Sequence, residues 1–234
     1  MPVVSETLSN WQRSLCPRVE VAGLVARNPV AHKWKAPFRG LVLRETTFWR
    51  IHDLLTQSYE LHINHRALGA RILLRSAFET LAVLIHLNQI AAQVLDGTLS
   101  FHAFSKKTTL LLLGSRDKTT KHEAINIVTV LTKHCEKAYP GISGLYASLC
   151  ESAHPNFEGM CFGYSRVDDI NHVSEFSNNM CAMYEEKHVS AIELCTAVFE
   201  HEYNTVWPEI FKRLESWIET NDGDLEATKD EVVV

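Results

Sequence analysis

The stretch from about His65 to Gln93 constrains the fold of this chain more than any other feature. It is apolar on nearly every side of a helix, and the few charges that interrupt it are Arg71, Arg75 and Glu79. A helix of this kind must be covered by other helices on most of its sides. The sequence therefore predicts a helical bundle with this segment buried at its centre.

The remaining sequence indicates the same class. Helical periodicity dominates, and runs of alternating polar and apolar residues are almost absent. We predict an all-α, single-domain bundle of six to eight helices, in which Pro208 kinks or splits the last one. The other helices are expected at about residues 5–26, 40–62, 100–113, 121–138, 143–153 and 188–217.

Proline, glycine and charge divide the chain into three predicted parts. An N-terminal helix and a connector with Pro29 and Pro37 occupy residues 1–39, and the bundle domain occupies residues 40–217. The acidic tail, residues 218–234, is expected to be flexible. Within the bundle, the polar, glycine-containing segment 156–187 predicts a long loop with at most a short helix.

Composition excludes several classes of protein. A net charge of −5 and a pI near 6.2 argue against a surface built to neutralise nucleic-acid phosphates. The start does not resemble a secretory signal, and the apolar runs fall short of the roughly 20 residues that a membrane-spanning helix needs. The six cysteines have no CxxC spacing and are typical of free thiols. We expect a cytoplasmic chain with no membrane segment, no cofactor and no metal site.

Arg71, Arg75 and Glu79 follow one another at intervals of four residues, so they form one stripe along the central helix. In one interpretation, Arg75 pairs with Glu79 and the stripe faces solvent or a polar seam. In the other, the arginines line a cleft and face an anion.

His154 is followed directly by Pro155 and Asn156. Proline disfavours helical geometry in the residue before it, so the helix is expected to end at or just before His154. Asn156 suits a turn, or a cap for whatever follows. The motif is therefore a helix stop in one interpretation. In the other, His154 is a proton donor or acceptor held at a rigid helix end.

Two motifs carry a family resemblance. ARILLRSAFETL, residues 70–81, and YASLCESAHPN, residues 146–156, resemble a family of bacterial and prophage-borne helical proteins with R-S-x-x-E in a central helix and Y-x-x-L-x-x-x-x-H-P-N at the end of a later one. The resemblance covers roughly residues 40–205. That family is similar to the HEPN superfamily of helical bundles, which often dimerise and include ribonucleases of toxin–antitoxin and phage-defence systems. The resemblance implies a homodimer.

Catalytic HEPN ribonucleases have an arginine, usually followed by a polar residue, and a histidine four to six residues further on. Three sets fit that spacing: Arg27 and Asn28 with His32, Arg116 and Asp117 with His122, and Arg166 and Val167 with His172. The best of these is Arg116 with His122, which has the polar second residue and is expected at a helix start. The alternative for this set is a solvated turn.

Two functions remain open. The first is a HEPN-like module that binds RNA or an antitoxin-like protein partner without catalysis, in a mobile-element or phage-defence context. The alternative is a metal-independent ribonuclease toxin, in which histidine and arginine serve as base and cation. The candidate site places His154 and Asn156 within reach of Arg75 and Glu79, and Arg116 with His122 is the weaker alternative. A structural clamp made by the same contacts is the competing interpretation of that site.

Overall fold

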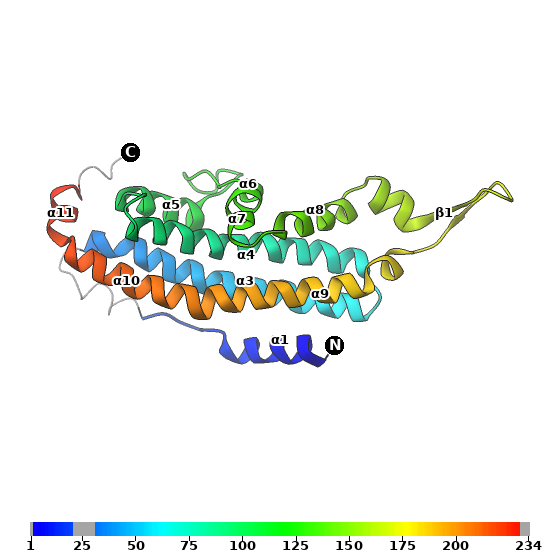
Figure 1. Ribbon diagram of the computed structural model, residues 1–234, viewed down its shortest axis with the longest axis horizontal. Coiled ribbons are helices and arrows are strands. Elements are labelled where there is room, and N and C mark those ends of the chain that lie inside the picture. Colours follow the sequence, from blue (N-terminus) through cyan, green and yellow to red (C-terminus); the bar gives the residue numbers. More distant parts are fainter. Residues whose placement is uncertain (1, 21–30, 230–234) are drawn as a thin grey trace. The chain divides into compact units, whose positions relative to one another are not determined.

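The computed structural model describes residues 2–20 and 31–229, and helices dominate these ranges (Figure 1). The sheet found in them is a two-stranded antiparallel hairpin of β1 (Ser165–Asp168) and β2 (Val173–Phe176). The predicted all-α class is therefore confirmed. None of the described helices combines the length and the apolar composition that crossing a bilayer requires.

The chain divides into two compact units that share its long helices. Unit 1 comprises Met1–Ser14, Trp49–Leu81 and Leu131–Val198, and unit 2 comprises Leu15–Phe48, Ala82–Val130 and Phe199–Val234. Three helices contribute residues to both units: α3 (Lys35–Ile63), α4 (Ala67–Leu95) and α9 (Met180–His201). The predicted central helix is observed as α4, which has fully buried apolar side chains in each unit, such as Phe78 and Leu87.

Unit 1 also contains α1 (Pro2–Ser14), most of a π-helix at Val130–Cys135, α7 (Glu136–Ala138) and α8 (Ile142–Ala153). A second π-helix, Phe157–Phe162, leads into the hairpin. A small apolar cluster of Ala67, Met180 and Tyr184 joins the first turns of α4 and α9. Figure 1 shows the hairpin extending away from the helices of this unit.

Unit 2 has an apolar core cluster that includes Trp34, Phe104 and Trp207. Its further elements are a short 3-10 helix (Ala31–Trp34), α5 (Phe101–Leu113), α6 (Ile127–Thr129), a π-helix (Glu202–Val206), α10 (Trp207–Thr220) and α11 (Asp222–Ala227). Ser100 caps α5 by accepting a 3.2 Å hydrogen bond from the amide of Ala103.

Proline explains two of the observed helix boundaries. α8 ends at Ala153, and His154 adopts an extended conformation with φ −85° and ψ 150°, as expected of a residue before proline. Pro208 lies in the first turn of α10, directly after the π-helix Glu202–Val206, so the predicted interruption of the last helix is confirmed. Pro37, in contrast, does not mark a loop. It lies in the first turn of α3, where a missing N–H removes no helical hydrogen bond.

Three other segments differ from the sequence prediction. Residues 156–187 contain a π-helix, the hairpin and the start of α9 in place of a long loop. The strands have four residues each and no buried face, so they lack the alternation that signals a strand. The N-terminal helix ends at Ser14, and residues 21–26 of its predicted range lie outside the described residues.

The predicted flexible tail is helical as far as Ala227. Ile218 and Leu225 are 0% and 5% exposed and belong to the core of unit 2. Ile218 comes from the end of α10 and Leu225 from α11, so both helices of the tail pack against this core.

Candidate functional site

Arg71 is almost completely buried in unit 1, with 2% of its surface exposed. Its Nε donates to Ser152 Oγ at 2.6 Å, and its Nη2 donates to the carbonyl oxygen of Ser148 at 3.0 Å. The guanidinium carbon lies 3.7 Å from the centre of the Tyr184 ring. In the described part of the chain no carboxylate lies within ion-pair distance of Arg71. Neutral groups alone therefore make its direct contacts, and burial lowers its pKa.

A carboxylate acts on Arg71 from beyond the Tyr184 ring. The Tyr184 hydroxyl donates to Glu158 Oε1, and burial followed by this contact raises the pKa of Tyr184. The charges of Tyr184 and Glu158 raise the pKa of Arg71 against the larger effect of burial. Glu158 therefore compensates the cation only partly and without touching it.

His188 is 1% exposed, and its hydrogen bonds fix its tautomer. Ser58 Oγ donates its single proton to the carbonyl oxygen of Ala70 at 2.7 Å. The 3.1 Å contact between Ser58 Oγ and His188 Nε2 must then use a proton on Nε2, so Nδ1 carries a lone pair. This Nδ1 is buried and has no hydrogen-bond partner among the residues that the structure describes. Burial, together with the charges of His62 and Arg71, lowers the pKa of His188 to about 3.

His62 stacks on His188, with ring centres 4.8 Å apart and the planes inclined by 25°. Burial lowers the pKa of His62, and Glu185 opposes that effect. A cavity of about 110 Å³ lies beside the two rings. It is lined by His62, Ile63, His65, Ala67, Arg71, Cys181, Tyr184, Glu185 and His188.

The first predicted site is only partly assembled. Arg75 and Glu79 do meet α8, but through Tyr146, whose hydroxyl donates to Glu79 Oε1 at 2.6 Å. Arg75 Nη2 lies 3.4 Å from both Glu79 Oε1 and the Tyr146 oxygen. His154 is eight residues further along, about 12 Å on a helix axis at 1.5 Å per residue. The structure therefore does not bring His154 to Arg75 and Glu79.

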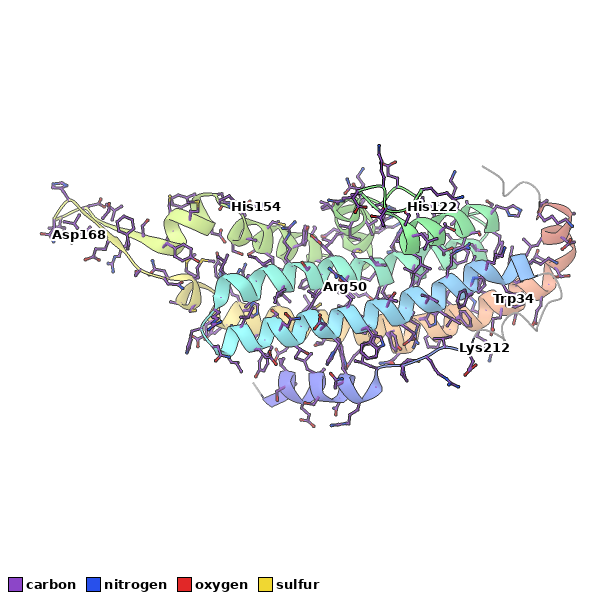
Figure 2. The ribbon with its side chains drawn as sticks, turned by 180° about the vertical axis from the view of Figure 1, so that it is seen from behind. Trp34, Arg50, His122, His154, Asp168 and Lys212 are labelled. Atoms are coloured by element: carbon purple, nitrogen blue, oxygen red, sulfur yellow. The ribbon has the colours of Figure 1, made fainter. Side chains whose placement is uncertain are left out.

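His154, Pro155 and Asn156 form a helix stop, one of the two interpretations that the sequence left open. His154 is exposed at the end of α8 (Figure 2). Asn156 caps the following π-helix: its Oδ1 accepts from the amide of Gly159 at 2.9 Å, and its Nδ2 donates to Glu151 Oε2 at 2.5 Å. The motif ends one helix and begins the next.

Arg116 and His122 lie in the loop between α5 and α6, and the helix expected at Lys121 begins at Ile127. The amide of Ser115 donates to the His122 carbonyl oxygen at 2.9 Å, so His122 holds the loop through its backbone. The Arg116 side chain is exposed and that of His122 is half-buried; Figure 2 marks the position of His122. The structure joins the two by no hydrogen bond or ring contact.

The other two arginine–histidine sets do not form sites in the described residues. Arg166 lies on β1 and His172 in the hairpin turn, and both side chains are exposed. Arg27 and Asn28 lie outside the described residues.

The cavity residues His62, His188 and Tyr184 were not predicted. The packing of the end of α3 against the start of α9 brings His62 and His188 together across 126 positions of sequence. A weak signal existed, because Tyr184 and His188 are four residues apart and share one face of α9. Arg71 itself belonged to the predicted stripe.

Comparisons of the chain with family models, with curated protein sequences and with solved structures found no match. Among the described residues, no group of three or more histidine, cysteine or acidic side chains is arranged to hold a metal ion.

Proposed function

We propose that the protein is a HEPN-like helical module that binds a protein partner, without catalysis, through residues 157–176, here called the arm. Seven of the 14 exposed large apolar side chains among the described residues lie in this segment. They are Phe157, Met160, Phe162, Val167, Ile170, Val173 and Phe176. Apolar patches of this kind mark interaction surfaces, and this concentration is the observation that carries the proposal.

The register of the hairpin separates charged from uncharged side chains. Ser165 pairs with Phe176 and Val167 with Ser174, so these four side chains share one face. Val167 and Phe176 are 62% and 82% exposed on it. The opposite face has the pairs Arg166 with Glu175 and Asp168 with Val173. The uncharged face is the surface that a partner would cover.

The stability of the hairpin supports this choice. Every residue of β2 is exposed, and an isolated two-stranded hairpin is marginally stable in water. Covering one face would supply the apolar burial that the hairpin lacks.

Charge favours a protein over RNA as the partner. The arm has four carboxylates, Glu158, Asp168, Asp169 and Glu175, and Arg166 is its single strong base. Such a surface repels phosphates. We propose a partner with an apolar groove rimmed by lysine or arginine, in a cytoplasmic setting. The mobile-element or phage-defence context rests on the two sequence motifs.

The ribonuclease alternative has weaker support. Tyr146 occupies the place proposed for His154, and Arg116 and His122 are joined by no side-chain contact. Cleavage needs a base and a cation that act on one phosphate.

A photo-crosslinking amino acid placed at Val167, with Arg166 as the matched position on the opposite face, tests the proposal in cells that express the full chain. We expect one defined protein adduct from position 167 and a much weaker one from position 166. The purified adduct partner should then bind the native chain, and Val167→Ser with Phe176→Ser should weaken that binding at least tenfold. The pair Arg166→Ser with Glu175→Ser is the control. An adduct with RNA would overturn the proposal. An adduct with a second copy of this chain would overturn it too, and would show that the arm forms a homodimer.

A further inference from the structure

We propose that Tyr184 is a positioning residue for the arm, and that its hydrogen bond to Glu158, here called the anchor, fixes the direction in which the hairpin faces the partner. This inference rests on the proposed function, because it concerns how the same surface is held. Tyr184 is buried in unit 1 and does not belong to the face that a partner would cover.

The hairpin does not set its own direction. Figure 1 shows it extending away from the helices of unit 1, and every residue of β2 is exposed, so packing against the helices does not hold its strands. At the neck of the arm, the Asn179 amide donates to the Gly163 carbonyl oxygen at 2.9 Å, which joins the two ends of the arm to each other. The direction of the arm therefore depends on its base, the π-helix Phe157–Phe162 and the neck at Gly163.

Two glycines hold this base at two points. Gly159 lies against the end of α8, where an added Cβ would come within 2.1 Å of the His154 carbonyl oxygen. Gly163 lies against the start of α9, where an added Cβ would come within 2.6 Å of Met180 Sδ. Two points of contact leave a rigid segment free to rotate about the line that joins them. A third contact, away from this line, is needed to fix the direction in which the hairpin faces.

The anchor supplies the third contact. The Tyr184 hydroxyl donates to Glu158 Oε1, and within the described ranges no other side-chain hydrogen bond joins Phe157–Phe162 to α9. Because adjacent residues of a helix point in different directions, the Glu158 carboxylate lies off the line through the two glycines. The acceptor is charged, and hydrogen bonds to charged groups are stronger than those between neutral groups.

The donor side of the anchor is held from behind. Tyr184 is 6% exposed, and the Arg71 guanidinium carbon lies 3.7 Å from the centre of its ring. Arg71 is hydrogen-bonded in turn to Ser148 and Ser152 of α8. The stacked pair therefore joins α4, α8 and α9 at the base of the arm, and the charge of Glu158 acts on Arg71 across it. Arg71 thus has a structural purpose without a carboxylate in direct contact, because it fixes the ring that carries the anchoring hydroxyl.

Loss of this hydroxyl should change the direction of the arm more than the stability of the fold. Glu158 is half-buried, so without the hydroxyl its carboxylate can turn to water. What is lost is preorganisation, because a partner must then stop the rotation of the hairpin when it binds. Tyr184 therefore acts on partner affinity through Glu158 and without touching the partner.

Spin-label distance measurements on the full chain, without a partner, test the anchor. The labels are attached to genetically encoded keto amino acids at Asp169, in the hairpin turn, and at Lys187, exposed on α9, so that the native cysteines stay unlabelled. Tyr184→Phe and Glu158→Ala should each broaden the distance distribution roughly twofold or more. Glu158→Gln keeps an acceptor oxygen and should retain most of the native width.

The matched control is Tyr164→Phe, which removes an arm hydroxyl that has no hydrogen bond within the described residues and should leave the width unchanged. Equal widths in the native chain and in Tyr184→Phe would overturn the anchor, as would equal broadening in Tyr164→Phe. The urea midpoint of Tyr184→Phe should stay close to that of the native chain. A large fall in that midpoint would mean that Tyr184 holds the fold rather than the arm, and would contradict the proposal.

Partner binding separates this inference from the proposed function. With the partner identified by the adduct at Val167, Tyr184→Phe should weaken binding about three- to tenfold, and Tyr164→Phe should leave it unchanged. A broadened distribution with unchanged affinity would overturn the positioning role and leave the partner surface intact. Absence of a protein adduct at Val167 would overturn the proposed function, and the distance distributions would still decide whether the anchor holds the arm.

Discussion

Lys33 in unit 2 and Arg71 in unit 1 are both almost fully buried cations, yet their surroundings differ. Lys33 Nζ lies 2.6 Å from Asp222 Oδ1 and 3.3 Å from Glu226 Oε2. Arg71 meets two serines and the face of a tyrosine. Lys33 therefore has carboxylates in direct contact, whereas Arg71 borders a cavity and has no carboxylate in direct contact within the described ranges.

Two other polar pairs of unit 2 also place a carboxylate next to a donor. Arg44 pairs with Glu45, which also accepts from the Tyr203 hydroxyl at 2.9 Å. Asn88 donates to Glu202 Oε2 at 2.5 Å. Arg71 differs from these groups because, among the described residues, no carboxylate contacts it directly.

Removing both counter-charges of Lys33 should have the largest effect. Asp222→Asn with Glu226→Gln leaves the ammonium buried without an anion, and we expect a loss of about 3 kcal/mol in the free energy of unfolding, measured by urea denaturation. The control is Glu209→Gln, in an exposed pair with Arg213, which should change stability by less than about 0.5 kcal/mol. An equal loss of stability in the double variant and in Glu209→Gln would mean that the contacts of Lys33 contribute no more than an exposed ion pair.

The pH dependence of stability tests whether unit 1 buries His188 as a neutral ring. The pKa of His188 falls from 6.5 to about 3 on folding, so between these values the unfolded chain binds the extra proton. Stability should therefore fall as pH drops through this window. For this one group the loss from pH 6.5 to pH 5 is roughly 1.5 kcal/mol. His188→Met should flatten the profile by that amount, and an unchanged profile would show that His188 is not buried as a neutral ring.

The sequence predicted the helices better than the contacts between them. Arg71 and Arg75 were recognised because a spacing of four is a local property of one helix. Their contacts with other helices were not predicted correctly, because Tyr146 lies within α8 and His154 follows its last residue, and the sequence does not say which of the two lies opposite Arg75. Which residue of α8 lies opposite a given residue of α4 depends on the register between the two helices, and no local sequence pattern determines that register.

The arm and the C-terminal tail both show that burial depends on tertiary contacts that the local sequence does not predict. Both looked polar and irregular in sequence, because each mixes a few apolar residues with glycine and acidic residues. Ile218 and Leu225 are buried in a core that lies nearby, and Val167 and Phe176 are exposed because none covers them. The side chains are alike, and only the tertiary surroundings separate a docked helix from an exposed hairpin.

Arg75 is an intermediate case, half-exposed and paired with a carboxylate, so its hydrogen bonds should contribute only modestly to the free energy of unfolding. Tyr146→Phe removes the hydroxyl that donates to Glu79 and accepts from Arg75, and we expect a loss of about 1 kcal/mol in thermal or urea unfolding. His154→Ala, just after the end of the same helix and exposed, should cost less than about 0.5 kcal/mol. A larger loss for His154→Ala would mean that the histidine has a structural contact after all.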